Sequence, residues 1–231
     1  MTESNQNSES EDVSINTAVI KAERRYRDAA RTARRSGDLE VAGAHYVAAA
    51  RGGLMHSRRL PEETDTVDEL SVQPGFGPAM KELFAGALCF RLAGTERRCE
   101  YHCEQGIAIA ADAREEFYTY PAEIGLSHEM IGDFRLLADR DDYDDAYAAA
   151  AERYAPVEND LGWQMEDGFD DLSHFLLVLA ASVGMAPDDD LRNTIARTSL
   201  DERIAYRREH YPEIIDAVVE AGNWESSNPW R

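Results

Sequence analysis

Apolar residues recur at three- and four-residue intervals along most of the chain, the spacing that gives a helix one apolar face. The first such segment covers about residues 15–36. Later segments cover about 39–53, 78–93, 95–117, 121–139, 139–154 and 169–184, and three more begin at Pro187, after Ser199 and at Pro212. The alternation typical of a half-buried strand does not occur, so the sequence predicts an all-α fold.

Composition divides the chain into segments. Residues 1–13 are polar and acidic, and we expect them to form a disordered tail. Residues 14–221 carry the helical pattern and are expected to form a single α-helical repeat domain, interrupted at about 57–77 by a linker with several prolines and glycines. Residues 222–231 are expected to form a C-terminal tail with two tryptophans.

Paired helices with small residues at their packing positions narrow the fold. The stretch "YRDAARTARRSGDLEVAGAHYVAAA" resembles a tetratricopeptide repeat, a helix–turn–helix unit, through Tyr26, Ala29, Ala30, Ala33, Gly37, Ala42, Tyr46 and Ala49. A second copy is matched by Leu83, Ala87, Phe90, Gly94, Cys99, Cys103 and Gly106. A weaker third copy is matched by Met130, Phe134 and Leu137, with "DDYDDA" standing where the family usually shows "GDYDEA".

The copies are spaced by 57 and then 47 residues, whereas the family repeats every 34. The resemblance covers roughly residues 18–155. It implies antiparallel helix pairs with inserted linkers, arranged as a short right-handed superhelix or α-solenoid, as in relatives that attach to vesicle-fusion machinery. The alternative is an unrelated antiparallel bundle, because small residues at helical spacing are common in bundles.

The segment "AERRYRDAARTARRSGD" holds six of the 24 basic residues of the chain. On a helical wheel five of them lie within about 100° of arc, opposite the apolar face. These five are Arg24, Arg27, Arg31, Arg34 and Arg35. The repeat resemblance implies that they face the concave groove in which family members bind peptides, and it adds Lys81, Arg91 and Arg135 from the other copies. We therefore expect a basic groove that binds an acidic peptide or protein surface, because arginine forks bind carboxylates through paired hydrogen bonds.

A structural interpretation of the arginine stripe stands beside this one. A charged stripe opposite an apolar face also pairs with acids of the same chain, such as the N-terminal tail or residues 141–145. Nucleic acid is not expected as a partner. Binding that neutralises six phosphates weakens by about five orders of magnitude per tenfold rise in salt.

The overall charge is strongly negative, as in proteins that work in concentrated salt. The chain carries 45 acidic and 24 basic residues, a net charge of −21, and only two of its basic residues are lysine. With 33 alanines, this composition resembles that of proteins from salt-accumulating haloarchaea, in which negative charge maintains solubility. The N-terminus lacks the basic start and apolar run of a signal peptide, and no apolar run is long enough for a membrane span. We therefore expect a cytoplasmic protein without a membrane partner.

Two motifs resemble parts of metal sites. "CEYHC" places Cys99, His102 and Cys103 within one turn, but a structural zinc site takes four ligands and the cysteines match packing positions, so no metal is expected. The chain has three cysteines, an odd number, and no signal-peptide pattern, so we do not expect a disulfide framework. Asp171 and His174 lie one turn apart, as in half of a di-iron site, yet the chain has no Glu-x-x-His.

"DDYDD" carries the DDxxD pattern with which all-α isoprenoid synthases hold magnesium and diphosphate, here through Asp141, Asp142 and Asp145. Such enzymes need a second acid-rich motif, and "DGFDD" at Asp167–Asp171 is a loose match. We therefore expect a non-catalytic scaffold or adaptor without a cofactor. The alternative is a metal-dependent all-α enzyme acting on a diphosphate.

Overall fold

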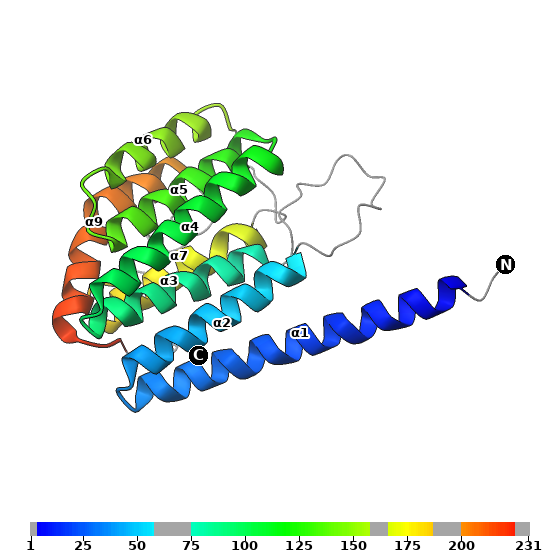
Figure 1. The fold of residues 1–231 in the computed structure, drawn as a ribbon. Helices are drawn as coiled ribbons and strands as arrows, with labels where there is room; N and C mark the ends of the chain where they lie inside the picture. Colours follow the sequence, from blue (N-terminus) through cyan, green and yellow to red (C-terminus); the bar gives the residue numbers. More distant parts are fainter. Residues whose placement is uncertain (1–3, 58–74, 158–165, 187–199, 225–231) are drawn as a thin grey trace.

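The computed structural model describes residues 4–57, 75–157, 166–186 and 200–224 (Figure 1). Within these ranges the chain forms eight α-helices and no strand, which confirms the all-α prediction. The helices are α1 (Ser4–Arg35), α2 (Leu39–Ser57), α3 (Phe76–Leu92), α4 (Glu96–Glu116), α5 (Pro121–Leu137), α6 (Tyr143–Tyr154), α7 (Glu166–Ser182) and α9 (Leu200–Ala221). In the same ranges, no helix combines the length and apolar character needed to cross a membrane.

Helices α1 to α6 pack in chain order, each against the next. Short turns join α1 to α2, α3 to α4 and α5 to α6, so the two members of each pair run in opposite directions (Figure 1). Each turn contains one residue in the left-handed conformation: Gly37 with φ 80°, Gly94 with φ 68° and Asp139 with φ 59°. Glycine adopts this conformation without steric penalty, and aspartate is among the few other residues that tolerate it.

Helix α7 returns to the middle of this row, whereas α9 lies against its end. Helix α7 packs against α3, and α9 packs against α6 and α7. Aromatic rings connect these layers, since Phe84 of α3 lies 5.5 Å from Phe134 of α5 and 6.2 Å from Phe175 of α7, between ring centroids. Phe175 in turn lies 5.8 Å from Trp224. In a regular solenoid each repeat contacts only its neighbours, whereas here α7 closes the row onto α3.

Two glycines allow neighbouring helices to approach closely. The ring of Phe134 lies 2.5 Å from the point where a Cβ atom on Gly106 would stand, and the ring of Tyr147 lies 2.5 Å from the corresponding point at Gly132. Both glycines lie within helices, where alanine is the better helix former. Their role is therefore to make room for an aromatic ring of the next helix.

Most residues at the packing positions of the repeat resemblance are buried, including Tyr46, Leu83 and Phe134. Tyr26 differs, because it is 44% exposed. Its ring contacts the ring of His45 in α2, with 6.0 Å between the two ring centroids. Helix α1 stands at the end of the row and packs mainly against α2. It therefore buries a narrower face than the helices inside the row.

Two boundaries differ from those expected. Helix α1 begins at Ser4, within the segment expected to be a disordered tail, and residues 4–13 contain no proline or glycine that would stop a helix. Helix α9 continues through Pro212, where the pattern predicted that a new helix begins. Proline removes one helical hydrogen bond. Here Tyr211 and Ile215, on either side of it, are both buried on the core face, so packing maintains one helix.

Several predicted features lie outside the described residues. These are residues 58–74 of the linker, the helix expected at Pro187, Ser199 and the chain beyond Trp224. Trp224 itself, expected in a C-terminal tail, is 3% exposed and belongs to the core.

Candidate functional site

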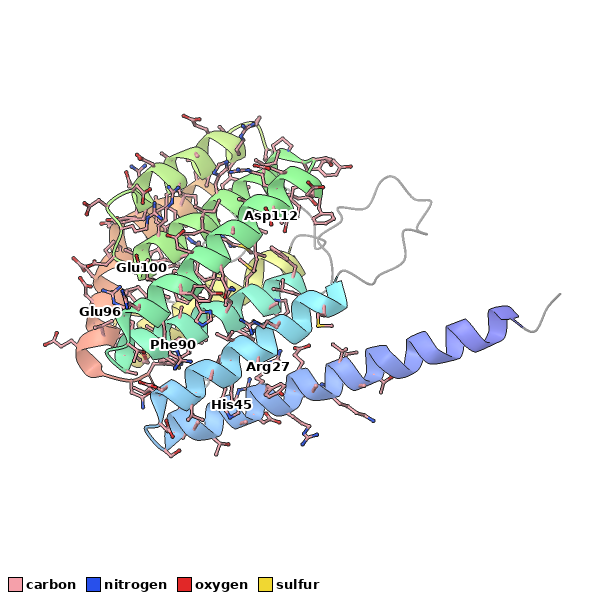
Figure 2. All side chains as sticks on the ribbon, in the orientation of Figure 1. Arg27, His45, Phe90, Glu96, Glu100 and Asp112 are labelled. Atoms are coloured by element: carbon pink, nitrogen blue, oxygen red, sulfur yellow. The ribbon has the colours of Figure 1, made fainter. Side chains whose placement is uncertain are left out.

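The arginine stripe of α1 borders a pocket of about 360 Å³ between α1 and the start of α3. The charged residues of this basic pocket are Arg24, Arg27, Arg31, Lys81 and Glu23. Apolar surface is supplied by Ile20, Gly75 and Pro78. Four of the eight residues predicted for a groove therefore lie together, and Figure 2 shows one of them, Arg27, on α1.

Arg27 is the fixed cation of the basic pocket. Its Nε donates to Oε1 of Glu82 at 2.5 Å, and its Nη2 pairs with the carboxylate of Glu23. Burial raises the pKa of Glu82, and the Arg27 guanidinium opposes this effect because it favours the charged carboxylate. Two carboxylates thus oppose the single charge of Arg27, so the net positive charge of the pocket comes from Arg24, Arg31 and Lys81 and is smaller than their sum.

Arg24 and Arg31 are exposed at the mouth of the basic pocket. Arg31 Nη1 lies 3.8 Å from Oδ1 of Asp28, and exposed pairs of this kind contribute little energy. Arg24 has no hydrogen bond or ion pair with any residue that the structure describes. Both guanidiniums can therefore bind an incoming anion without breaking a buried contact.

Arg34 faces away from the basic pocket and is 2% exposed. Its Nη1 donates to the carbonyl oxygen of Trp224 and, at 3.3 Å, to Oδ1 of Asn223. Its guanidinium carbon lies 4.5 Å from the centre of the Trp224 ring. Arg34 is therefore paired within the fold. Its partners are a backbone carbonyl, an amide oxygen and an aromatic ring, and not the acids that the structural interpretation suggested.

The other three predicted groove residues are also apart from the basic pocket. Arg35 is exposed at the end of α1. Arg91 donates to the carbonyl oxygen of Leu137 at 2.8 Å, and Arg135 donates to that of Asp142 at 3.0 Å. Arg91 thus binds the C-terminus of α5, where a cation is favourable because the last carbonyls are unpaired.

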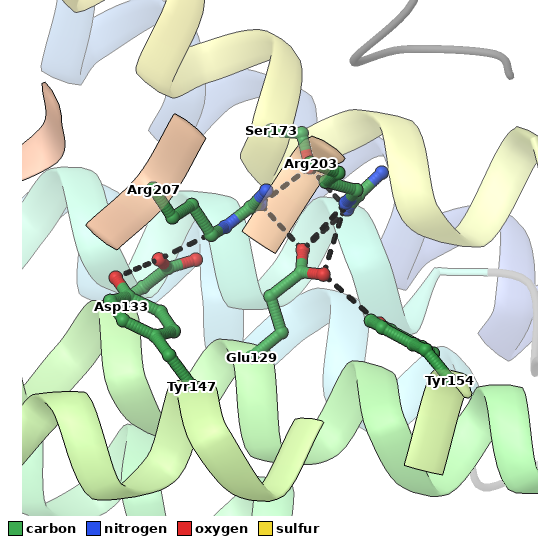
Figure 3. A network of polar contacts seen from close by, with 7 residues as sticks. All are labelled: Glu129, Asp133, Tyr147, Tyr154, Ser173, Arg203 and Arg207. Atoms are coloured by element: carbon green, nitrogen blue, oxygen red, sulfur yellow. Dashed lines mark hydrogen bonds and ion pairs between the residues drawn. The ribbon is translucent and has the colours of Figure 1, made fainter. Parts of the chain in front are cut away.

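A second polar cluster, which the sequence analysis did not identify, lies in the core between α5, α6, α7 and α9 (Figure 3). This buried ion network consists of Glu129, Asp133, Tyr147, Tyr154, Ser173, Arg203 and Arg207. Arg203 Nε lies 2.9 Å from Oε1 and 3.0 Å from Oε2 of Glu129. Arg207 bridges the two acids, with Nη2 2.5 Å from Oε1 of Glu129 and Nε 3.3 Å from Oδ1 of Asp133.

Hydroxyl groups complete the buried ion network. Tyr154 donates to Oε2 of Glu129 at 3.0 Å, and Tyr147 donates to Oδ1 of Asp133 at 2.7 Å. Ser173 Oγ accepts from Arg207 Nη2 at 2.8 Å. Every member is at most 3% exposed. Such an enclosed cluster is suited to joining helices and not to receiving a ligand from solvent.

The two carboxyl groups of the network differ in acidity. Burial raises the pKa of Asp133 to about 6, although Arg207 favours its charged form. Burial acts in the same direction on Glu129, but Arg203 and Arg207 outweigh it, and the pKa of Glu129 is lowered. Glu129 therefore remains an anion between two guanidiniums, whereas Asp133 has one longer contact to a guanidinium.

A sequence signal for this network exists. Glu129 and Asp133 are four residues apart, and so are Arg203 and Arg207. Both pairs lie on apolar faces of their helices. Residues four apart are neighbours on a helix surface, so matched acidic and basic pairs on two apolar faces predict a buried ladder of ion pairs.

The aspartates of the enzyme interpretation lie at the turn into α6. The carboxylate of Asp142 accepts hydrogen bonds from Nε and Nη2 of Arg140, each at 3.0 Å, while Asp141 and Asp145 are exposed. The side chains of Asp167–Asp171 lie outside the described residues. Among those that the structure describes, no three His, Cys, Asp or Glu side chains are grouped as metal ligands. A cation at Asp142 would have to displace Arg140.

The "CEYHC" side chains have separate partners. The rings of His102 and Phe90 stack at 5.3 Å, and Nδ1 of His102 shares a hydrogen bond with Gln105 at 2.8 Å. Cys99 and Cys103 are buried, as expected from the packing positions that they match.

No family model, no curated protein and no solved structure matches this chain.

Proposed function

We propose that the protein is a non-catalytic scaffold or adaptor that binds an acidic peptide or protein segment in the basic pocket. The observation that carries this proposal is the convergence of Arg24, Arg27, Arg31 and Lys81 on one pocket of about 360 Å³, in a chain whose net charge is −21. A local cluster of cations within an acidic surface selects ligands of the opposite sign.

The ligand chemistry follows from the lining. Arg24 and Arg31 each present a planar fork that matches a carboxylate. Ile20 and Pro78 offer apolar contact beside these forks. A peptide that mixes acidic and apolar residues uses both kinds of surface, whereas a nucleic acid would depend on its phosphates, whose binding weakens steeply with salt.

The likeness to tetratricopeptide repeats supports the same site. Members of that family bind peptides along the first helices of their pairs, and α1 and α3 are the first helices of their pairs in this chain. Because the composition resembles that of haloarchaeal proteins, we expect the ligand to bind in concentrated salt. At about 1 M salt the screening length is roughly 3 Å, so ion pairs in direct contact outlast long-range attraction.

The test is the affinity for a short labelled peptide of alternating glutamate and leucine, measured by fluorescence anisotropy at low salt and in concentrated KCl. The variant Arg24→Glu/Arg31→Glu removes two forks from the pocket. We expect its Kd to rise by at least about 100-fold, since each of the two lost charge-assisted contacts contributes about 1.5 kcal/mol or more. Circular dichroism verifies that the variant is folded.

The matched control is Arg25→Glu/Arg35→Glu, which makes the same change in charge on the same helix with exposed residues outside the basic pocket. We expect less than about a threefold change in Kd at high salt, where screening removes long-range effects. Equal losses in both variants, no binding by the wild type, or tighter binding of single-stranded DNA would contradict the proposal.

A further inference from the structure

A second pocket, of about 540 Å³, opens beside the first turn of α4. Its lining includes Arg91, Cys99 and Leu137 together with the three acids Glu96, Glu100 and Asp139, of which Figure 2 labels the first two. We name it the thiol pocket, because the Cys99 side chain forms part of its wall.

Cys103 lies directly behind Cys99. The two Sγ atoms are 4.0 Å apart, and Cys103 is fully buried. A helical rise of about 1.5 Å per residue separates their Cα atoms by about 6 Å. This is within the range of about 4.4–6.8 Å that disulfides span. The Cβ atoms of residues four apart on a helix are about 5–6 Å apart, whereas a disulfide needs about 3.5–4.5 Å. The bond therefore requires the first turns of α4 to unwind locally as the two side chains rotate.

The surroundings of Cys99 favour its thiolate. The hydrogen bond from Cys103 lowers the pKa of the Cys99 thiol more than burial raises it, and the charge of Arg91 lowers it further, against a smaller opposing effect of the Glu100 carboxylate. Arg91 donates to the carbonyl oxygen of Leu137 at 2.8 Å, which holds its charge near the sulfur. The Cys99 thiol donates to the same carbonyl oxygen at 3.8 Å, and this contact is lost when the thiol ionises. Cys99 also lies near the N-terminus of α4, where the helix dipole stabilises an anion.

The other cysteines have the opposite character. Burial raises the pKa of Cys89 to about 12. It also raises the pKa of Cys103 well above its ordinary value, and the neighbouring Cys99 adds to this effect. Cys89 is fully buried in α3 and serves as an internal reference for the reactivity of a core thiol.

We propose that Cys99 and Cys103 form a peroxide-sensitive thiol pair, in which Cys99 is oxidised first and Cys103 resolves it. The Cys99 thiolate attacks one oxygen of a hydroperoxide, so that an S–O bond forms while the O–O bond breaks. The departing oxygen takes a proton and leaves as water or an alcohol. Cys99 is then a sulfenic acid without negative charge, which removes one cause of the high pKa of Cys103.

In the second step the Cys103 sulfur attacks the Cys99 sulfur. The S–S bond forms as the S–O bond breaks, and the hydroxide leaves with the Cys103 proton as water. Two thiols are thereby oxidised by two electrons to one disulfide, and one hydroperoxide is reduced. A dithiol reductant reverses the change. The thiol pair is separate from the basic pocket, so this inference is independent of peptide binding.

The experiment treats the full-length protein with hydrogen peroxide and maps the thiols by mass spectrometry. In the wild type we expect a Cys99–Cys103 disulfide, with Cys89 still a thiol. Cys103→Ser should stop at a sulfenic acid on Cys99, which dimedone traps. Cys99→Ser should leave Cys103 reduced, and Cys89→Ala should behave as the wild type does.

The rate of Cys99 oxidation tests the role of the positive charge of Arg91. We expect Cys99 to react at least about tenfold faster than Cys89, and Arg91→Met to slow this reaction by about tenfold while Arg91→Lys keeps most of it. If Cys89 is oxidised as fast as Cys99, the proposal is overturned, because equal rates are what exposure of all cysteines by unfolding would produce. A wild-type protein in which Cys99 stays a sulfenic acid beside a reduced Cys103 also overturns it.

Discussion

Arg34, near the end of α1, donates to the carbonyl oxygen of Trp224, and its guanidinium lies over the ring of the same residue. The two residues are 190 positions apart in the chain. An arginine expected to bind a ligand thus connects the first helix to the segment after the last one. The planar donor fork that suits a ligand carboxylate suits this carbonyl and this ring equally well.

A double-mutant cycle of Arg34→Lys and Trp224→Leu measures that connection. Lysine keeps the charge but loses the planar fork, so we expect a coupling of about 1–2 kcal/mol in the free energy of unfolding, as for a desolvated cation–π pair. The control is Arg98→Lys with Phe90→Leu, because the guanidinium lies 3.9 Å from the ring but Arg98 is exposed. There the coupling should be about 0.5–1 kcal/mol. A smaller value at Arg34 than at Arg98 would contradict the buried contact.

Removing one member of the buried ion network should be strongly destabilising. Arg207→Met leaves Asp133 without a cation and Glu129 with only one, so we expect a loss of about 3–5 kcal/mol in urea unfolding. Arg208→Met is the control on the same helix. Its fork to Asp144, at 2.6 and 2.7 Å, is exposed and should contribute less than about 1 kcal/mol. Similar losses in the two variants would show that the network contributes no more than a surface pair.

The raised pKa of Asp133 makes stability depend on pH. The folded carboxyl has a pKa of about 6 and the unfolded one about 3.8, so between these values the folded state binds more protons. The contribution is therefore fully present below about pH 4 and is lost as the pH rises through about 6. Relative to Asp133→Asn, the wild type should lose about 3 kcal/mol across this window, since one pKa unit corresponds to about 1.4 kcal/mol.

The measurement is urea unfolding of both proteins at several pH values. Subtracting the two curves cancels the titration of all other groups to first order. A difference curve for Asp133→Asn that is flat, or that rises with pH, would contradict the raised pKa.

Two glycine-to-alanine substitutions within helices should have opposite effects. At Gly106 the new Cβ atom would lie 2.5 Å from the buried Phe134 ring, so we expect a loss of about 1–3 kcal/mol from overpacking. At Gly52 the closest atom is Glu23 Cβ at 3.4 Å, and the better helix propensity of alanine should stabilise the protein by up to about 1 kcal/mol. Thermal unfolding compares them. A Gly106→Ala variant at least as stable as the wild type would show that the close contact with Phe134 is not limiting.

The helix pairs were predictable because their signals are local. Periodic apolar residues mark the helices, and Gly37 and Gly94 mark two turns through the left-handed conformation that glycine adopts easily. Pro212 was misleading, because the same local signal that correctly begins α5 at Pro121 does not break α9, where packing on both sides maintains the helix. Local patterns therefore predict where a helix can begin, and tertiary contacts decide whether it does.

The candidate site was predictable only in part. The stripe on α1 predicts a basic surface, and Arg24 and Arg31 are exposed beside the basic pocket. A helical wheel of α1 alone could not show that Arg34 lies in the core, because its partner Trp224 comes from the other end of the chain. The return of α7 onto α3 is likewise set by contacts between distant segments, which periodicity along one helix does not record.

The buried ion network has a consequence for the order in which the protein is made. Glu129 and Asp133 leave the ribosome 74 residues ahead of the arginines that pair with them. Until α9 has been synthesised, two carboxylates lie on the face of α5 that will become core, and water must hydrate them. A growing chain that ends before Leu200 would thus contain helices α1 to α7 around a hydrated centre. The arrival of Arg203 and Arg207 converts that centre into a dry one, so the last helix completes the fold.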